Sequence, residues 1–149
     1  MAHIQKRILI HAPVEKVYAL ARNPEHWNQW WVGLSEPEKL DGKGEVGTTV
    51  KLHYKMAGID FPVTTRVIED RADPNESRVK LEVEGPLEGK QDWTYKAKGK
   101  DTEVDARIDY TVPGKAVGKL IDKVLVEKMT ERSAEHTLEN LKLICEARA

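Results

Sequence analysis

The hydrophobic period of the sequence changes near residue 113, and this change constrains the fold more than any other feature. Between residues 34 and 112, apolar and polar side chains alternate with the period of two that is typical of β-strands. Turn signals separate the alternating segments, at Asp41-Gly42, Ala57-Gly58, Asp73-Pro74-Asn75, Glu84-Gly85-Pro86 and Gly99-Lys100-Asp101. The pattern predicts a meander of antiparallel strands.

One face of this predicted sheet is apolar, while the facing positions carry mostly Lys, Arg, Glu and Asp. The apolar face collects Val50, Leu52, Tyr54, Met56, Phe61, Val63, Thr65, Val67, Val79, Leu81, Val83, Gln91, Trp93, Tyr95, Ala97, Val104, Ala106, Ile108, Tyr110 and Val112. A sheet with one solvated face needs a cover on the other. After Pro113-Gly114, apolar residues recur at helical spacing from Val117 to Cys145, and no Gly or Pro follows Gly118. The predicted cover is therefore one long helix.

The first thirty residues predict one strand and two short helices. Alternation over residues 4–11 indicates the strand, with Lys6 on the same side as three isoleucines. Pro13 begins a short amphipathic helix, and Asn23-Pro24 caps and starts a second one that carries three tryptophans. Together with the meander and the long helix, this order predicts an α+β fold.

Size and composition limit the classes of protein that fit. The 149 residues predict a single domain over residues 1–149. Because 24 Lys and Arg nearly balance 25 Asp and Glu, the net charge is −1 and we expect no nucleic-acid partner. The apolar runs are too short to span a bilayer, so we expect no integral membrane association. The single Cys145 and the lack of a signal-peptide hydrophobic region predict a cytoplasmic protein, and the sequence does not determine its oligomeric state.

This order of elements resembles the helix-grip fold of the START-like superfamily, also called SRPBCC, which includes the birch pollen allergen and polyketide cyclase/dehydrase-like proteins. The stretches that carry the likeness are Ile10–Tyr18, Asn23–Trp30, Gly42–Gly47 and the closing helix. They are specific for the fold and poor indicators of function. The resemblance implies a curved antiparallel sheet of about seven strands that grips the long helix. It also implies a deep cavity between sheet and helix, for a lipid, polyketide, steroid or other small apolar molecule.

The residues that we expect to line this cavity as a ligand-binding site are Leu52, Tyr54, Met56, Trp93, Tyr95, Ile108, Tyr110, Leu125 and Met129. The tyrosines and Trp93 are expected to orient the ligand, and Met129 to adapt to its shape. In this register the central strands place no Asp, Glu, Lys, Arg or His on the inner face, so general acid–base catalysis has no group to use. We predict no catalytic residue, no metal ion and no cofactor.

The predicted function is binding or transport of a small hydrophobic or amphipathic ligand such as a lipid or polyketide. A polyketide cyclase/dehydratase-like enzyme is one alternative, with a tyrosine hydroxyl or a charged residue polarising a carbonyl group. A shift of register by one residue would supply that charge by turning Arg66, Asp92, Arg107 and Asp109 inward. The other alternative is a protein-interaction module in which side chains fill the core, because an apolar lining fits a packed core as well as a cavity.

Glycines at positions 42, 44 and 47 match the pattern that cradles a dinucleotide phosphate. A strand-like segment follows them instead of a helix, so we interpret Gly42–Gly47 as a turn. By resemblance to START-like proteins, this loop is expected to border the cavity and to gate entry. Trp27 and Trp30 are interpreted as structural, with Trp31 more exposed.

The five histidines are scattered without metal-ligand spacing, and we interpret them as surface or capping residues. An approach of His136 to the cavity from the long helix is the less favoured alternative. Cys145 is interpreted as a small core residue.

Overall fold

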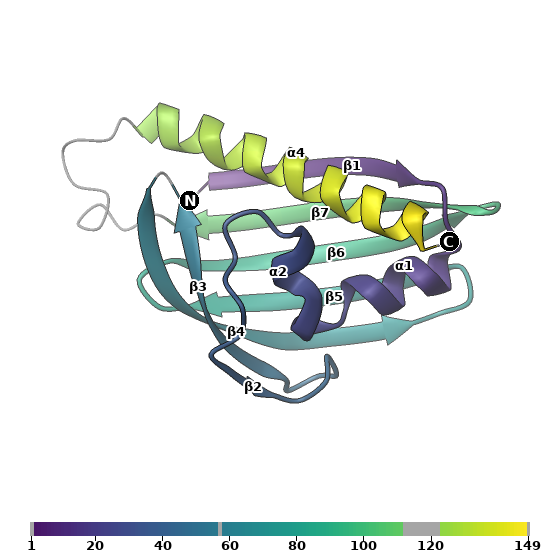
Figure 1. The fold of residues 1–149 in the computed structure, drawn as a ribbon, viewed down its shortest axis with the longest axis horizontal. Coiled ribbons are helices and arrows are strands. Elements are labelled where there is room, and N and C mark those ends of the chain that lie inside the picture. Colours follow the sequence, from purple (N-terminus) through teal and green to yellow (C-terminus); the bar gives the residue numbers. More distant parts are fainter. Residues whose placement is uncertain (1, 57, 112–122, 149) are drawn as a thin grey trace.

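The computed structural model describes residues 2–56, 58–111 and 123–148, apart from the side chains of residues 123–126. Seven strands form one antiparallel sheet in the order β1-β7-β6-β5-β4-β3-β2 (Figure 1). The strands are β1 (Ala2–Ile10), β2 (Lys39–Asp41), β3 (Thr49–Met56), β4 (Ile59–Ala72), β5 (Glu76–Glu84), β6 (Glu88–Lys98) and β7 (Asp101–Thr111). Each predicted turn signal lies where one strand ends and the next begins, which confirms the meander.

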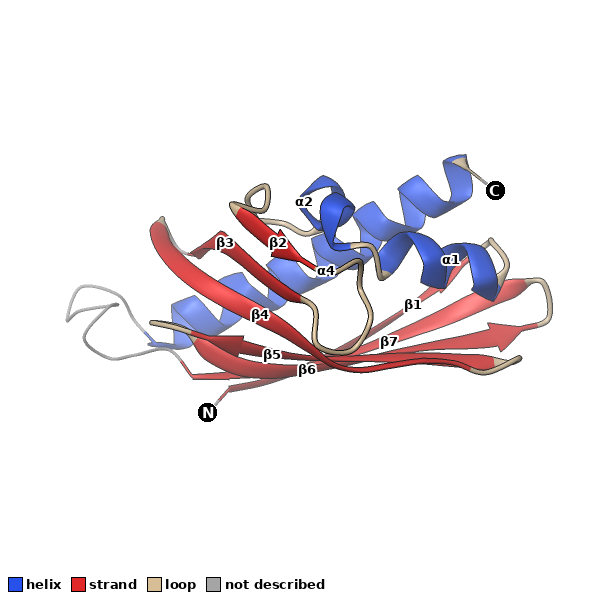
Figure 2. Ribbon diagram, turned by 90° about the horizontal axis from the view of Figure 1, so that it is seen from below, coloured by secondary structure: helices blue, strands red, loops and turns tan. Residues whose placement is uncertain are grey.

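The helical elements lie together on one face of the curved sheet (Figure 2). They are α1 (Val14–Ala21), the 3-10 turn η1 (Pro24–His26), α2 (Trp27–Trp30) and α4 (Lys123–Ala147). The Asn23 side chain accepts a hydrogen bond from the Glu25 backbone N–H at 3.1 Å, so the predicted cap is present. The long helix α4 runs beside β1. Val112 of the predicted sheet face and residues 117–122 of the predicted helix lie outside the described residues. The α+β helix-grip architecture is confirmed.

Burial along the strands follows the predicted register. Val50, Val104 and Ala106 are buried on the helix-covered face, whereas Arg66 and Arg107 are exposed on the other. On that solvated face the Arg78 guanidinium binds the Asp92 carboxylate through two hydrogen bonds of 3.0 and 2.8 Å. The one-residue register shift is therefore wrong.

A β-bulge in β4 changes this pattern locally. The pairing of β4 with β5 shifts between Val67 and Glu69, and beyond the shift Asp70 lies opposite the buried Val79. Because directly opposed residues share a face, the bulge turns Asp70 inward. There its carboxylate accepts hydrogen bonds from the Tyr18 hydroxyl and from the Arg22 Nη2, the latter at 2.7 Å. The expectation of an inner face without charges fails at Asp70, and the resulting cluster ties α1 to the sheet.

The tryptophans form one aromatic cluster between α2 and the sheet. Trp30 is 2% exposed, stacks on Trp31 at 5.5 Å between ring centroids, and meets Trp93 edge-on at 5.7 Å. The buried Trp27 donates its indole N–H to the Ala21 carbonyl at 2.9 Å. Buried aromatic area of this size is enough to hold a helix of one turn against the sheet. The structural interpretation of Trp27 and Trp30 is confirmed, and Trp31 is the more exposed ring.

Candidate functional site

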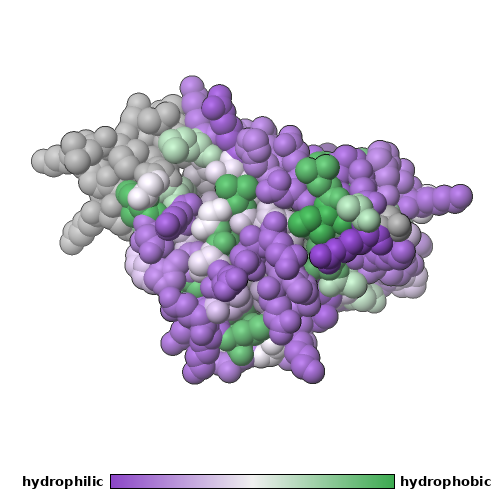
Figure 3. Space-filling model, in the orientation of Figure 1, coloured by the Kyte–Doolittle hydropathy of each residue, from purple (hydrophilic) through white to green (hydrophobic). Residues whose placement is uncertain are grey.

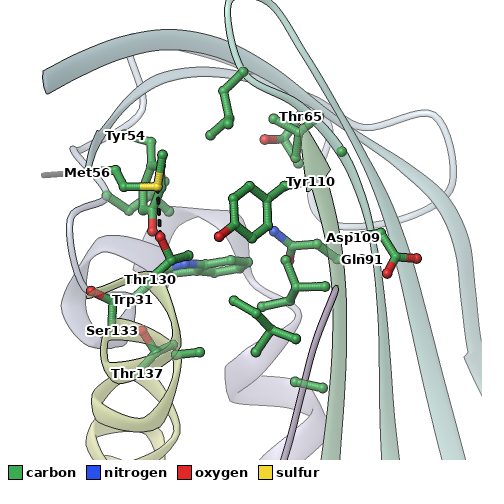
Figure 4. A pocket seen from close by; sticks show the side chains of 18 of the residues that line it. Trp31, Tyr54, Met56, Thr65, Gln91, Asp109, Tyr110, Thr130, Ser133 and Thr137 are labelled. Atoms are coloured by element: carbon green, nitrogen blue, oxygen red, sulfur yellow. Dashed lines mark hydrogen bonds between the residues drawn. The ribbon is translucent and has the colours of Figure 1, made fainter. Parts of the chain in front are cut away.

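A cavity lies between the inner face of the sheet, the α2 region and α4 (Figure 4). The space open to the centre of a water molecule is about 80 Å³. One water molecule needs only about 10–15 Å³ of occupied volume, and its centre then has almost no freedom to move, so this space exceeds that of a single water several-fold. The cavity is therefore large enough for a small organic molecule.

The walls of the cavity are mainly apolar and aromatic. Trp27, Trp31 and Leu34 supply the wall from α2 and the segment after it, and Trp93 and Ile108 supply the floor from β6 and β7. Trp31 joins the two walls, because its ring lies 5.3 Å from that of Trp93 and 6.2 Å from that of Trp27. Apolar walls with a few polar groups are typical of small-molecule sites.

The main polar group inside the cavity is the hydroxyl of Tyr110. Its side chain reaches into the cavity from β7, with the hydroxyl end directed toward α4 (Figure 4). Tyr110 is 5% exposed, and its hydroxyl has no hydrogen-bond partner among the described residues. Burial raises the pKa of Tyr110. The Thr130 hydroxyl lies near enough to oppose this rise, although the geometry between the two hydroxyls is not that of a hydrogen bond. A neutral hydroxyl that can both donate and accept a hydrogen bond thus faces the cavity.

A second tyrosine and a row of hydroxyl side chains complete the polar part of the lining. Burial raises the pKa of Tyr54 to about 12, so this phenol also stays neutral. Thr130, Ser133 and Thr137 line the cavity from α4, at helical spacings of three and four that place them on one face. The Thr137 hydroxyl accepts a hydrogen bond of 3.1 Å from the Val32 backbone N–H and so holds the α2–β2 segment against α4.

The charged residues of the lining are bound to partners or exposed. The Lys6 ammonium lies 2.8 Å from carboxylate oxygens of both Glu131 and Glu135 on α4, and these two hydrogen bonds raise its pKa. The Asp109 carboxylate binds the exposed His3 ring, and its side chain points away from the cavity in Figure 4. Glu88 is exposed. Around the cavity, the described residues offer no free cation.

The structure brings together five of the nine residues that were expected to line the cavity: Tyr54, Met56, Trp93, Ile108 and Tyr110. Met56 accepts a hydrogen bond from the Thr130 hydroxyl at 3.0 Å, which joins β3 to α4. That these residues bind a ligand stays a prediction.

Of the other four, three lie elsewhere. Leu52 and Tyr95 are buried in the core away from the cavity, and Tyr95 packs edge-on against Tyr18 under α1, at 5.9 Å between ring centroids. Met129 is 41% exposed, since it lies outside the inward face of α4. The side chain of Leu125 lies outside the described residues.

Sequence reasoning missed the α4 hydroxyls and the residues after α2. Thr137 and Thr130 precede the buried Leu141 by four and eleven positions, which places all three on one face of a helix. The helical period could therefore have indicated that the two threonines face inward. Nothing in the sequence indicated that the segment after α2 folds back along β3, where Leu34 pairs with Tyr54. A glycine makes this return possible: Gly33 has φ +84°, and a Cβ atom there would lie 2.5 Å from the Lys55 carbonyl oxygen.

The remaining candidate motifs lie away from the cavity. None of Gly42–Gly47 contributes to its described lining, so gating by this loop finds no support in the geometry. His136 is exposed beside Glu139, and His53 lies between Glu38 and Asp60 on the outside of the sheet. Cys145 is buried in the core, as predicted. Over the described ranges, we find no group of three or more His, Cys, Asp or Glu side chains placed to hold a metal ion.

No helix within residues 2–56, 58–111 and 123–148 is long and apolar enough to cross a bilayer.

Comparisons with known proteins agree with this geometry. In fold, the chain is similar to a protein from Thermus thermophilus with a TM-score of 0.76 and 21% identity, covering 99% of both chains. It is similar to an aromatase/cyclase from a Streptomyces species, with a TM-score of 0.76, 16% identity and coverage of 99% of this chain and 94% of that one. A START superfamily protein from Mycobacterium smegmatis matches with a TM-score of 0.74 and 16% identity over 99% of both chains.

Among curated proteins, no sequence matches the chain significantly. The family model described as polyketide cyclase / dehydrase and lipid transport matches residues 1–146, nearly the whole chain. The chain therefore belongs to the polyketide cyclase/dehydrase and lipid transport family, which has the START-like fold.

Proposed function

We propose that the protein binds a small amphipathic molecule in the cavity between the sheet and α4. The observation that carries this proposal is the buried hydroxyl of Tyr110, which faces an open cavity without a partner among the described residues. Buried polar groups in proteins nearly always have hydrogen-bond partners. A ligand oxygen or a water molecule in the cavity would supply the one that Tyr110 lacks.

The lining supports a ligand that is mostly apolar. Aromatic rings from Trp31 and Trp93 flank the cavity, and stacking on such rings favours a flat, unsaturated molecule. The open space argues against a core filled by side chains, and so against an interaction module of that kind. The single cysteine fits a reducing compartment, and we place this binding activity in the cytoplasm.

Catalysis of the cyclase/dehydratase type is a second candidate, because of the same hydroxyl. A phenol whose pKa is raised by burial stays protonated, and it can donate a hydrogen bond to a carbonyl oxygen that gains negative charge. In the described lining, Lys6 is ion-paired, Asp109 binds His3 and Glu88 is exposed at the edge, so we find no acid or base inside the cavity to move a second proton, which favours binding. Turnover of a model poly-β-ketone that is lost in Tyr110→Phe would support the enzyme instead.

The proposal is tested with 2-naphthol, a two-ring aromatic alcohol, by isothermal titration calorimetry. We expect one site per chain in the wild-type protein. Ala134 lines the cavity from α4 and is buried, so Ala134→Leu should occupy the cavity and abolish binding. Ala19 is exposed on α1, and Ala19→Leu is the matched control that should bind normally.

Thermal melts of both variants establish that they are folded at the titration temperature. Binding by a folded Ala134→Leu variant, or no binding by the wild-type protein, would contradict the proposal.

A further inference from the structure

We propose that the cavity selects an uncharged ligand that places one oxygen atom at the Tyr110 hydroxyl, and that it discriminates against carboxylates. This inference rests on the proposed function and names the class of ligand. It follows from the position of one hydroxyl and from the charges around it.

The Tyr110 hydroxyl defines where the ligand oxygen lies. It is buried, it is directed into the cavity toward α4, and no described residue forms a hydrogen bond with it (Figure 4). The Gln91 amide oxygen accepts the Trp93 indole N–H at 2.9 Å, and no hydrogen bond joins the Gln91 amide to the Tyr110 hydroxyl. A hydroxyl or carbonyl group on the ligand can pair with Tyr110, because the phenol both donates and accepts.

The charges around the cavity oppose an anion. Lys6 is the cation of the described lining, and it contacts two carboxylates, so this cluster has one positive and two negative charges. Glu88 adds negative charge at the edge of the cavity. The carboxylates of Glu127 and Glu131 lie near enough to Tyr110 to raise its pKa by their charge, and the same charges oppose an anion beside this hydroxyl.

A carboxylate at Tyr110 would therefore lose its hydration, be repelled by the nearby glutamates, and gain one neutral hydrogen bond. An alcohol, phenol or ketone loses much less hydration and gains the same hydrogen bond. Of two amphipathic molecules with the same apolar body, the described lining thus favours the one with a neutral head group over the one with a carboxylate.

Three probes with the same two-ring frame test this inference at pH 7: naphthalene, 2-naphthol and 2-naphthoate. By titration calorimetry, we expect 2-naphthol to bind most tightly and 2-naphthoate at least about tenfold more weakly. Tyr110→Phe removes the hydroxyl and keeps the ring. In this variant, 2-naphthol should lose about three- to tenfold in affinity while naphthalene is unchanged.

A second variant tests the role of charge independently of Tyr110. Glu131→Gln/Glu135→Gln releases the Lys6 ammonium from both partners, and 2-naphthoate should then gain about tenfold in affinity relative to 2-naphthol. The matched control, Glu15→Gln/Glu139→Gln, removes the same number of charges from exposed positions and should leave the ratio unchanged.

The outcomes separate the two proposals. If none of the three probes binds to the wild-type protein, the proposed function and this inference both fail. If 2-naphthol binds but 2-naphthoate binds equally well, or if folded Tyr110→Phe keeps the full preference for 2-naphthol over naphthalene, binding stands and the selectivity proposed here is wrong.

Discussion

The hydroxyl groups of Tyr110 and Tyr18 make opposite contributions to stability, and removing each one tests this directly. Both substitutions to Phe delete a single oxygen atom from a phenol. The Tyr18 hydroxyl donates to the Asp70 carboxylate, whereas the Tyr110 hydroxyl is buried without a partner among the described residues. In the ligand-free protein, Tyr18→Phe should therefore be destabilising, whereas Tyr110→Phe should not be.

The expected magnitudes follow from these contacts. A hydrogen bond to a charged group contributes about 1.5–3 kcal/mol, so Tyr18→Phe should lower the free energy of unfolding by that amount. A buried polar group without a partner is destabilising by about 1–3 kcal/mol. Tyr110→Phe should thus raise the free energy of unfolding, by up to about 3 kcal/mol if the cavity is dry and by nearly nothing if water occupies it.

Urea unfolding monitored by tryptophan fluorescence measures both changes, and the slopes show whether the denatured state is altered. For a chain of this length, 1 kcal/mol corresponds to about 2–4 °C in melting temperature, so calorimetry gives an independent value. A loss of 1 kcal/mol or more in Tyr110→Phe would mean that its hydroxyl is satisfied within the protein. That result would refute the reasoning, as would a neutral Tyr18→Phe.

Three further variants test other parts of the structure. Gly33→Ala places a Cβ atom 2.5 Å from the Lys55 carbonyl oxygen in a left-handed conformation, so it should destabilise the protein by at least about 2 kcal/mol in urea unfolding. The hydrogen bond to Glu38 raises the pKa of His53 above its unfolded-state value of 6.5. The protonated His53 therefore stabilises the fold below pH 6.5, and this stabilisation is lost as the pH rises through the folded-state pKa. The wild-type protein should therefore melt at a higher temperature than His53→Gln near pH 6, and this difference should shrink toward about pH 8.5. A difference that does not depend on pH would contradict this assignment. Asp70→Asn removes the charge that binds the Tyr18 phenol of α1 and the guanidinium of Arg22, the residue after α1. It should lower the free energy of unfolding by about 1.5–3 kcal/mol, whereas an unchanged urea midpoint would show that the cluster is not stabilising.

Local patterns in the sequence were sufficient to predict most of the fold. Alternation fixed which residues of β3 to β7 face the helices, because a one-residue shift would have buried Arg66 and Arg107. The Asn23 cap and the turn signals between strands were readable for the same reason, since each depends on residues that are close in sequence.

The inward charge at Asp70 could not be predicted in this way. The segment from Arg66 to Asp70 contains no Gly or Pro that would indicate a bulge, and Ile68 looks like an ordinary strand residue. The bulge depends on how β4 pairs with β5 while the sheet curves, which is a property of the tertiary structure.

The candidate site was predicted only in part, because a cavity depends on packing between distant elements. Tyr54, Trp93 and Tyr110 were found from their face of the sheet. Tyr95 shares that face but lies beneath α1, and the exposed Met129 shows that the phase of α4 was misjudged. The alternation along one strand shows which side chains face inward, but it does not show where the helices pack on them or where space stays open.

The most direct test of binding in the cavity is a crystal structure of the protein grown with 6-bromo-2-naphthol. The anomalous signal of bromine locates the molecule, and the electron density of the rings then orients the hydroxyl. We predict one molecule between the sheet and α4, with its rings beside Trp31 and Trp93 and its oxygen within hydrogen-bond distance of the Tyr110 hydroxyl. A cavity that stays empty at saturating concentration, or bromine found only on the protein surface, would contradict the proposed function.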